Sequence, residues 1–383
     1  MPEPSPELAA HLALALVPNL GPVRTRAVLA HFGGDPAAAL RATADQLRGV
    51  ESVGSKLAGQ FATSFRTADP AAEWALVQKH GVRVVPLGHP DYPARLATIP
   101  DPPALLYLRG ELLPADERAV AFVGSRACTP YGLRTAEKLA AGVAAAGWTV
   151  VSGLARGIDA AAHRGALDAG GRTLAVLAGG LHRIYPPEHA DLADRVANQG
   201  AILTETPMTV APQPGMFPAR NRVISGLSRG VVIVEANARS GALITATHAA
   251  EQGRDVYAVP GAVDSPASAG CLELLRTGVR LVRSADDILE DLAGIMGTGP
   301  APAKLPPRPT TTLFDAPPPA PSGPPPGLDG DLSRVWAALA GTKHADELSR
   351  ELAIPPGELA GVLLRLEMKK AVRRLPGNQW ERR

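Results

Sequence analysis

The strongest constraint on the fold of this chain is a regular alternation of two kinds of segment between Ala119 and Val282. Short runs rich in β-branched apolar residues alternate with longer runs whose apolar residues recur at helical spacing. Such an alternation predicts a mostly parallel sheet with helices on both faces, an α/β fold of the doubly wound, extended Rossmann type. The expected strands are 120–123, 149–151, 173–177, 201–203, 230–234, 255–259 and 280–282, and the expected helices are 131–146, 158–169, 190–199, 242–252 and 284–292.

The flanking sequence predicts three further parts. Residues 1–70 are expected to form a small helical N-terminal domain, and residues 71–297 the Rossmann-type core. The connecting stretch in front of the core is expected to contain a short strand over 82–86. Residues 298–330 are rich in proline and are expected to be an extended or disordered tether. Residues 331–383 contain three helical segments and then a strand, a turn and a strand, which is the element order of a winged helix.

Both terminal domains contain candidate DNA contacts. Two similar phrases, Asn19-Leu-Gly21 and Ser52-Val-Gly54, each place a glycine just before a helical run, as in a helix-hairpin-helix or a SAM-like domain. Helix amides behind such a turn can hold a DNA phosphate, but an ordinary pair of packed helices fits the pattern equally well. A winged helix binds either DNA or protein, so that choice also stays open. The candidate accessory contacts are Arg24, Arg26 and Lys56, together with Lys369, Lys370, Arg373 and Arg374.

Composition excludes several classes of protein. The formal net charge of the 383 residues is +2, so the chain is not strongly basic, as many nucleic-acid-binding proteins are. The two cysteines, Cys128 and Cys271, have neither metal-cluster nor disulfide-framework spacing, so no metal or cofactor is expected. The apolar run 8–17 is too short to span a bilayer and follows an acidic, Pro-rich start rather than a basic one. We therefore expect a cytoplasmic protein without membrane association.

The loops after the expected strands share a composition of glycine, serine and arginine. Ligands of doubly wound sheets bind at the carboxyl ends of the strands, where glycine lets the backbone approach an anion and arginine donates to phosphate oxygens. Several such loops along one edge suit a polynucleotide better than a mononucleotide. Phe217 is a candidate for stacking on a base, although a hydrophobic anchor for its loop is an equally good interpretation. The expected contacts are Gly124, Ser125, Arg126, Ser152, Gly153, Arg156, Gly157, Arg220, Asn221, Arg222, Arg239, Ser240 and Gly241.

No catalytic template fits the sequence. Residues 49–56 lack the adjacent Gly-Lys pair of a phosphate-binding P-loop. The letters around Ser228 match a nucleophile elbow, but Ser228 is expected to end a helix and precede a strand, the reverse of the required order. Asp159, Glu205 and Glu235 are carboxylates at element ends with no recognisable catalytic partner. We therefore expect a binding protein rather than an enzyme.

A series of ordered phrases across this region resembles the DNA-processing protein A family, called DprA or Smf. They are Val123-Gly-Ser-Arg126, Ser152 to Asp159, Tyr185-Pro186, Phe217 to Ser228, Val234-Glu-Ala236, Arg239 to Thr245 and Glu251 to Gly261. The resemblance implies a protein that binds single-stranded DNA and loads the RecA recombinase onto it in natural transformation and recombination. It also implies a homodimer formed through the core, with single-strand-binding protein as a further candidate partner.

The resemblance assigns Arg126, the loop 152–157 and the segment Arg220 to Arg222 to DNA contact. Several relatives carry a basic residue directly after Tyr-Pro, where this chain has Pro187; either His189 or Arg183 substitutes for it, or the contact is missing. The core also distantly resembles nucleotide phosphoribohydrolases of the lysine-decarboxylase-like type, which would make the chain an enzyme. However, the glycine pattern of their catalytic loop is absent from 236–245. A protein scaffold with unused phosphate loops is the third interpretation.

Overall fold

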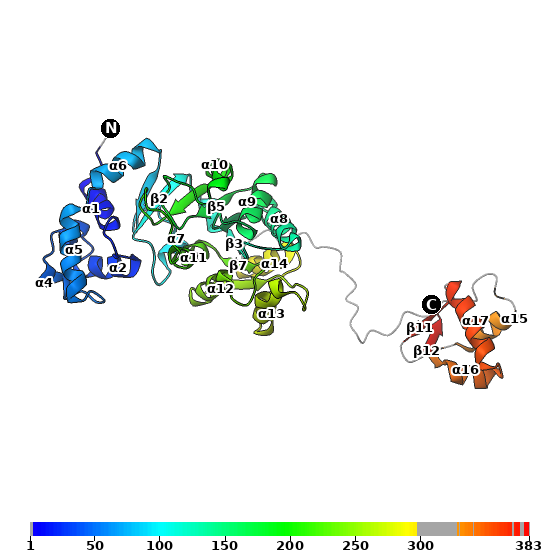
Figure 1. Cartoon of the computed structure of the whole chain (residues 1–383). Helices are drawn as coiled ribbons and strands as arrows, with labels where there is room; N and C mark the ends of the chain where they lie inside the picture. The colour runs from blue at the N-terminus through cyan, green and yellow to red at the C-terminus, as the bar shows by residue number, and fades with distance from the viewer. Residues whose placement is uncertain are drawn as a thin grey trace. The chain divides into compact units, whose positions relative to one another are not determined.

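The computed structural model describes residues 3–296, 328, 330–339, 341–369, 371–375 and 379–382. The chain divides into two compact units, residues 1–299 and 300–383 (Figure 1). The Pro-rich stretch 298–330 lies outside the described residues except at 328 and 330. Within the described part, no helix combines the length and the apolar character needed to cross a membrane.

The first unit is built around one nine-stranded sheet, with the strand order β1-β2-β6-β5-β4-β3-β7-β8-β9. From β6 to β9 all neighbours are parallel, which confirms the doubly wound Rossmann-type fold. Each of the seven expected strands forms within one residue at either end. Their bounds are β3 Ala119–Val123, β4 Thr149–Ser152, β5 Thr173–Val176, β6 Ala201–Thr204, β7 Gly230–Ile233, β8 Asp255–Ala258 and β9 Arg280–Leu281.

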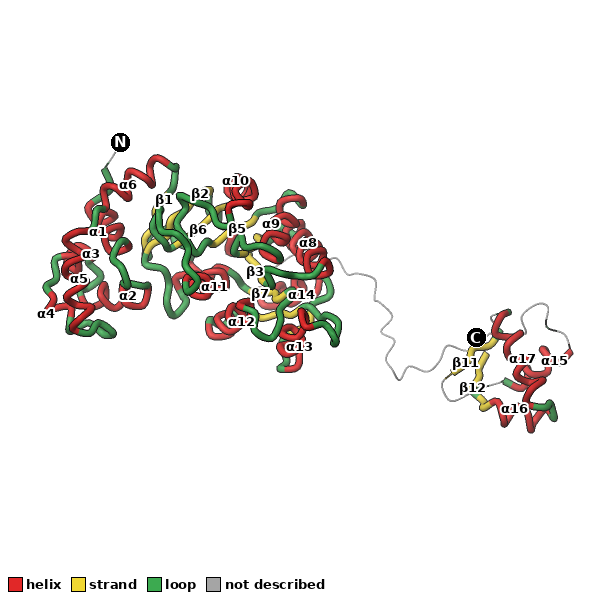
Figure 2. Tube along the Cα trace, viewed as in Figure 1, coloured by secondary structure: helices red, strands yellow, loops and turns green. Residues whose placement is uncertain are grey.

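Helices cover both faces of this sheet, and a hydrophobic core lies on each face. Successive side chains of each strand point into one core and then the other. Val120 and Phe122 of β3 pack with the helices on one face, whereas Ala121 and Val123 pack with those on the other. The first face carries α8 (Pro130–Ala145), α9 (Ile158–Asp168) and α14 (Ala285–Met296), with α10 (Ala190–Gln199) beside them (Figure 2). The second face carries α11 (Met216–Leu227), α12 (Gly241–Glu251) and α13 (Ala269–Arg276).

Two antiparallel strands, β1 (Arg83–Pro86) and β2 (Leu105–Gly110), extend the sheet beyond β6. The sequence predicts β1 but not β2. The short apolar run of β2 follows the prolines at 100, 102 and 103, which favour a loop when only the local sequence is considered. Pairing with β6 decides the outcome, because it satisfies the β2 backbone and buries Leu106, Tyr107 and Leu108.

The N-terminal helices pack in the same unit as the sheet (Figure 1). Leu14 and Phe61 belong to a separate helical core, while Leu12 joins Val77 and Tyr107 in a core shared with the sheet. The helices are α1 (Pro6–Ala15), α2 (Pro22–His31), α3 (Pro36–Leu40), α4 (Ala44–Leu47), α5 (Ser55–Thr67) and α6 (Pro70–Lys79), and α7 (Ala94–Ala97) lies between β1 and β2.

The second unit is a winged helix, as the sequence predicts. Its core includes Trp336, Leu363 and Trp380. A two-residue strand, β10, completes a three-stranded antiparallel sheet and was not expected, because two residues give no periodicity to read. The elements are α15 (Gly330–Ala338), β10 (Lys343–His344), α16 (Ala345–Leu352), α17 (Pro356–Met368), β11 (Val372–Leu375) and β12 (Gln379–Arg382).

Candidate nucleic-acid interface

The carboxyl edge of the sheet carries an open depression at its topological switch point. Strands β3 and β7 lie side by side, but their following helices α8 and α12 cover opposite faces, which opens a crevice between the two loops. The depression holds about 1180 Å³ of space and is lined by Arg126, Phe217, Asn221 and Gly241, among others. A second pocket adjoins it over β4 and β5. Together they bring most of the expected contact residues to one edge.

Four neighbouring loops at this edge each contribute one exposed arginine. Arg183 follows β5, Arg156 follows β4, Arg126 follows β3 and Arg239 follows β7, and these strands are adjacent in that order. We call these four residues the arginine row. Because neighbouring strands are about 4.8 Å apart, the ends of the four strands extend over about 14 Å. Arg126, Arg156 and Arg183 line the pockets, whereas Arg239 lines neither of them. A line of guanidinium groups of this length suits several phosphates of one chain.

Aromatic side chains lie beneath the middle of the row. The Arg126 guanidinium carbon is 4.4 Å from the centroid of the Phe217 ring, a cation–π contact. The Tyr185 ring lies next to Phe217 with 5.9 Å between centroids, and Tyr185 is 41% exposed. Phe217 therefore lies beside the expected phosphate contacts, with one ring face already covered by Arg126.

The amide groups of Ser125 and of Thr129, at the start of α8, already have hydrogen-bond partners within the chain. The Glu235 carboxylate accepts hydrogen bonds from the Thr129 amide (2.8 Å) and hydroxyl (2.5 Å). The Ser125 amide donates to the Glu235 carbonyl at 2.8 Å. Gly124 is required by packing, since a Cβ there would lie 2.5 Å from Ile158. The Ser125 amide is therefore not free for a phosphate, although Gly124 and Ser125 both line the larger depression.

The loop after β4 is likewise held by its own chain. Its amides at Gly153 and Ala155 donate to the Asp159 carboxylate at 3.1 and 3.3 Å. Ser152 is fully buried and donates its hydroxyl to the Phe122 carbonyl at 2.6 Å, so it is no DNA contact. Gly157 has φ +74°, and a Cβ there would lie 2.3 Å from the Ser125 carbonyl oxygen. Gly153 and Gly157 thus shape the loop, and Arg156 alone reaches outward.

Arg220 forms the floor of both pockets rather than part of their rim. It is buried and donates to the carbonyls of Gly153, at 2.9 Å, and Val176, which ties the β4 loop to the end of β5. Burial lowers the pKa of Arg220 to about 10, although the nearby Asp159 opposes this shift. Burial raises the pKa of Asp159 in turn, with Arg220 acting against it. Arg220 still carries its charge at neutral pH and adds positive potential from below.

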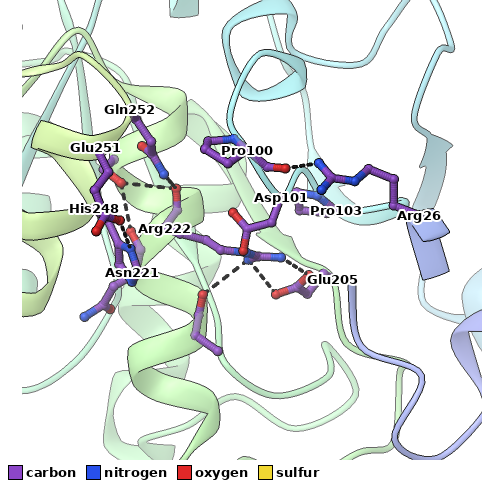
Figure 3. A network of polar contacts seen from close by, with 12 residues as sticks. Arg26, Pro100, Asp101, Pro103, Glu205, Asn221, Arg222, His248, Glu251 and Gln252 are labelled. Atoms are coloured by element: carbon purple, nitrogen blue, oxygen red, sulfur yellow. Dashed lines mark hydrogen bonds and ion pairs between the residues drawn. The ribbon is translucent and has the colours of Figure 1, made fainter. Parts of the chain in front are cut away.

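Arg222 lines neither pocket, although the sequence grouped it with Arg220. Its guanidinium is buried and contacts the Asp101 carboxylate at 2.8 Å and both oxygens of Glu205 at 2.8 and 2.7 Å (Figure 3). Burial opposes the charge of Arg222, but Glu205 and Asp101 outweigh it and raise its pKa. Arg222 is therefore neutralised inside the protein, and its expected role as a phosphate contact is corrected.

The start of α12 stays at the rim of the larger depression. The Ser240 hydroxyl accepts from the Ala242 amide at 3.3 Å and so caps the helix. The Asn221 side chain donates to the Gly241 carbonyl at 3.4 Å, which links α11 to this turn. No other atom of the chain would crowd a Cβ at Gly241. Asn221, Ser240 and Gly241 therefore remain candidates at the site.

The structure separates the two residues that could replace a basic residue at Pro187 by their burial. His189 is buried with its ring nitrogen Nδ1 2.8 Å from the Leu154 carbonyl oxygen, so it is unsuited to contact a ligand. Arg183 is exposed and lines the smaller pocket beside Arg126. The sequence named both residues, and only burial separates them. Nothing in the sequence indicated that Glu188 belongs to the site, where it forms a 2.5 Å ion pair with Arg156 at the rim.

The candidate contacts in the terminal domains have mixed positions. Arg24 donates to the carbonyls of Asn19 (3.0 Å) and Ser52 (3.3 Å) and so joins the two glycine turns, whereas Arg26 donates to the Pro100 carbonyl (Figure 3). Lys56 is exposed at the first turn of α5.

In the winged helix, Lys369 is exposed and Arg373 pairs with Glu381. Lys370 and the side chain of Arg374 lie outside the described residues.

In the described part of the chain, no three His, Cys, Asp or Glu side chains gather as metal ligands would. The three carboxylates considered as bases are all engaged: Glu235 with Thr129, Asp159 with the β4 loop, and Glu205 with Arg222. Fold and site together define a class, the doubly wound Rossmann-type proteins whose carboxyl edge presents exposed arginines.

Comparison with known proteins narrows this class. The family model for DNA recombination-mediator protein A matches residues 83–293, and the model for the DprA winged helix domain matches residues 317–378. Protein Smf of Synechocystis is 35% identical over 98% of this chain and 99% of its own length. DNA processing protein DprA of Bacillus subtilis is 42% identical over 57% of this chain and 74% of its own length. The chain belongs to the DNA recombination-mediator protein A family, DprA or Smf.

Solved structures agree with this assignment. DNA processing protein A from Streptococcus pneumoniae superposes with a TM-score of 0.64 at 36% identity, over 73% of this chain and 95% of that one. The protein from Helicobacter pylori gives a TM-score of 0.51 at 29% identity, over 56% of this chain and 96% of that one. The latter structure was described for its single-stranded DNA binding mode.

Proposed function

We propose that this protein binds single-stranded DNA along the arginine row. The observation that carries the proposal is that four adjacent loops each present one exposed arginine, in the order of the strands. Arginine forks pair with phosphate oxygens, while the aromatic pair Phe217 and Tyr185 offers a surface for a base. Single-stranded binding of the H. pylori relative supports the same ligand for this chain.

Binding of this kind is directed at the backbone and is tolerant of sequence. Phosphate contacts carry no sequence information, and stacking accepts every base. A base that reaches Phe217 competes with Arg126 for the ring face, so Arg126 has to move toward a phosphate as the base arrives. No covalent chemistry on the strand is part of this function.

The biological role that we propose is that of a recombination mediator. The protein protects incoming or exposed single strands and loads RecA onto them in natural transformation and recombination. It acts in the cytoplasm as a homodimer that encounters single-strand-binding protein on the same strands. Membership of the DprA/Smf family supports this role. Strand-exchange assays with RecA and single-strand-binding protein test it, and no acceleration of RecA filament assembly would count against it.

Fluorescence anisotropy with a labelled single strand and the matching duplex tests the binding function. We expect tight single-strand binding that Arg126→Ala weakens, with a salt slope smaller by about 0.7 because one phosphate contact is lost. Arg164→Ala removes an exposed arginine of α9 that lines neither pocket and serves as the matched control. Equal binding of duplex, or an effect of Arg164→Ala as large as that of Arg126→Ala, would place the DNA site elsewhere.

A further inference from the structure

A third depression lies at the same edge of the sheet, on the side of β8 and β9. It holds about 930 Å³ between the first turns of α8 and the loops that follow these two strands. We call it the α8 groove. Its lining residues are Tyr131, Arg134, Thr135, Lys138, Leu139, Val259, Pro260, Val282 and Arg283.

The α8 groove combines an aromatic ring with unpaired cations. Tyr131 is 46% exposed, and its hydroxyl donates to the Pro260 carbonyl at 2.9 Å, which holds the ring against the β8 loop. Arg134 and Lys138 follow at three and seven positions, so all three share one face of α8. Both cations are exposed, and neither has an ion-pair partner among the described residues. Arg283, in contrast, is held by Asp287 at 2.9 Å.

The α8 groove lies next to the arginine row along the edge of the sheet. The row covers β5, β4, β3 and β7, and the groove covers the next two strands, β8 and β9. Helix α8 starts four residues after Arg126, at Pro130, so its first turn adjoins the middle of the row. A polyanion that leaves the row in the direction of β8 therefore reaches two further cations and a ring.

We propose that single-stranded DNA continues from the arginine row into the α8 groove, where Tyr131 stacks on a base and Arg134 and Lys138 bind phosphates. The inference rests on the proposed function and adds the length of the bound strand to it. Five strand intervals from β5 to β9 extend over about 24 Å. At about 3.4 Å per stacked nucleotide this length holds about seven nucleotides, compared with about four for the row alone.

The length dependence of binding tests the inference in the full-length protein. Affinity of the wild-type chain for oligothymidine should rise between about four and about seven nucleotides and then level off. The double variant Arg134→Ser with Lys138→Ser should lose about 10-fold in affinity for a strand of about ten nucleotides and nothing for one of about four. Its salt slope on the longer strand should fall by about 1.4, since two contacts at about 0.7 each are lost.

Two controls separate this effect from others. Arg66→Ser with Lys79→Ser removes the same charge from the exposed ends of α5 and α6 and should leave both strands unaffected. Tyr131→Ala should weaken the longer strand about 10-fold, whereas Tyr131→Phe, which keeps the ring, should restore binding. An equal loss on both lengths, or no loss on the longer strand, would overturn the inference while leaving the arginine row in place. Absence of any single-strand binding by the wild type would overturn the proposed function and this extension with it.

Discussion

At the scale of single residues, the rim of the site contains one group that attracts a phosphate, Arg156, and one that opposes its binding, Glu188. Arg156 reaches outward from the β4 loop, but Glu188 holds it in a 2.5 Å ion pair. Hydrogen bonds from its own backbone amide and from Arg156 lower the pKa of Glu188, so the pair persists at neutral pH. A phosphate that binds Arg156 must therefore displace a carboxylate of the same chain.

Glu188→Gln should strengthen single-strand binding about threefold, because a phosphate no longer competes with a carboxylate for Arg156, and exposed ion pairs of this kind are weak. Anisotropy titrations measure the change, and Asp191→Asn, an exposed acid three positions on, controls for general repulsion. When Arg156 is already replaced by Ala, Glu188→Gln should increase single-strand affinity no more than the control Asp191→Asn does. The same gain in both backgrounds would show that Glu188 acts by repulsion alone.

Arg222→Ala should destabilise the protein by about 2–4 kcal/mol in urea unfolding, since Glu205 and Asp101 lose their counter-ion in a partly buried site. The salt slope of DNA binding should stay at the wild-type value, because Arg222 lies outside both pockets. A slope reduced by about 0.7, as expected for Arg126→Ala, would instead make Arg222 a direct phosphate contact.

At the scale of elements, buried polar contacts between helices and strands position the loops of the site. One of them joins α9 to β5, where the His163 ring lies 2.7 Å from the Thr173 hydroxyl. His163 is fully buried, and burial lowers its pKa to about 3. The folded protein thus holds this histidine neutral, whereas in the unfolded chain it takes up a proton near pH 6.5.

Stability should therefore decrease as the pH falls from about 6.5 toward 3, with a contribution from this site of up to about 1.4 kcal/mol per pH unit. Urea unfolding at several pH values measures the slope. His163→Leu removes the titrating group, and the Thr173 hydroxyl keeps its bond to the Val150 carbonyl. The variant should show a flatter profile below pH 6.5, and an unchanged profile would assign the acid sensitivity to other groups.

At the scale of the whole molecule, the arginine row, both adjoining pockets and the α8 groove all lie in the first unit. Among the described residues, each unit has hydrophobic cores of its own. A chain that ends at residue 296 should accordingly fold and keep its single-strand affinity within about threefold. Anisotropy and thermal melting test this, and a loss above about 10-fold would assign contacts to the winged helix, where Arg373 would be the first candidate.

The sequence by itself determined the fold and the family, and it predicted the edge of the sheet on which the proposed site lies. Strand and helix periodicities are local properties, and handedness and layer rules then leave few topologies for an alternating chain. The carboxyl edge follows from that topology, so Arg126, Arg156 and Phe217 could be predicted to lie together at this edge, where they line one pocket.

Only the tertiary structure decided which of these groups are exposed and which already have partners within the chain. Glu235 caps α8 from 106 positions away, and no local pattern shows that a distant carboxylate already occupies an amide. Arg220 and Arg222 are two positions apart in one helix and so face different surroundings, the pocket floor and the Glu205 pair. The choice of Arg183 over His189 likewise depends on burial, which is set by packing between segments far apart in the chain.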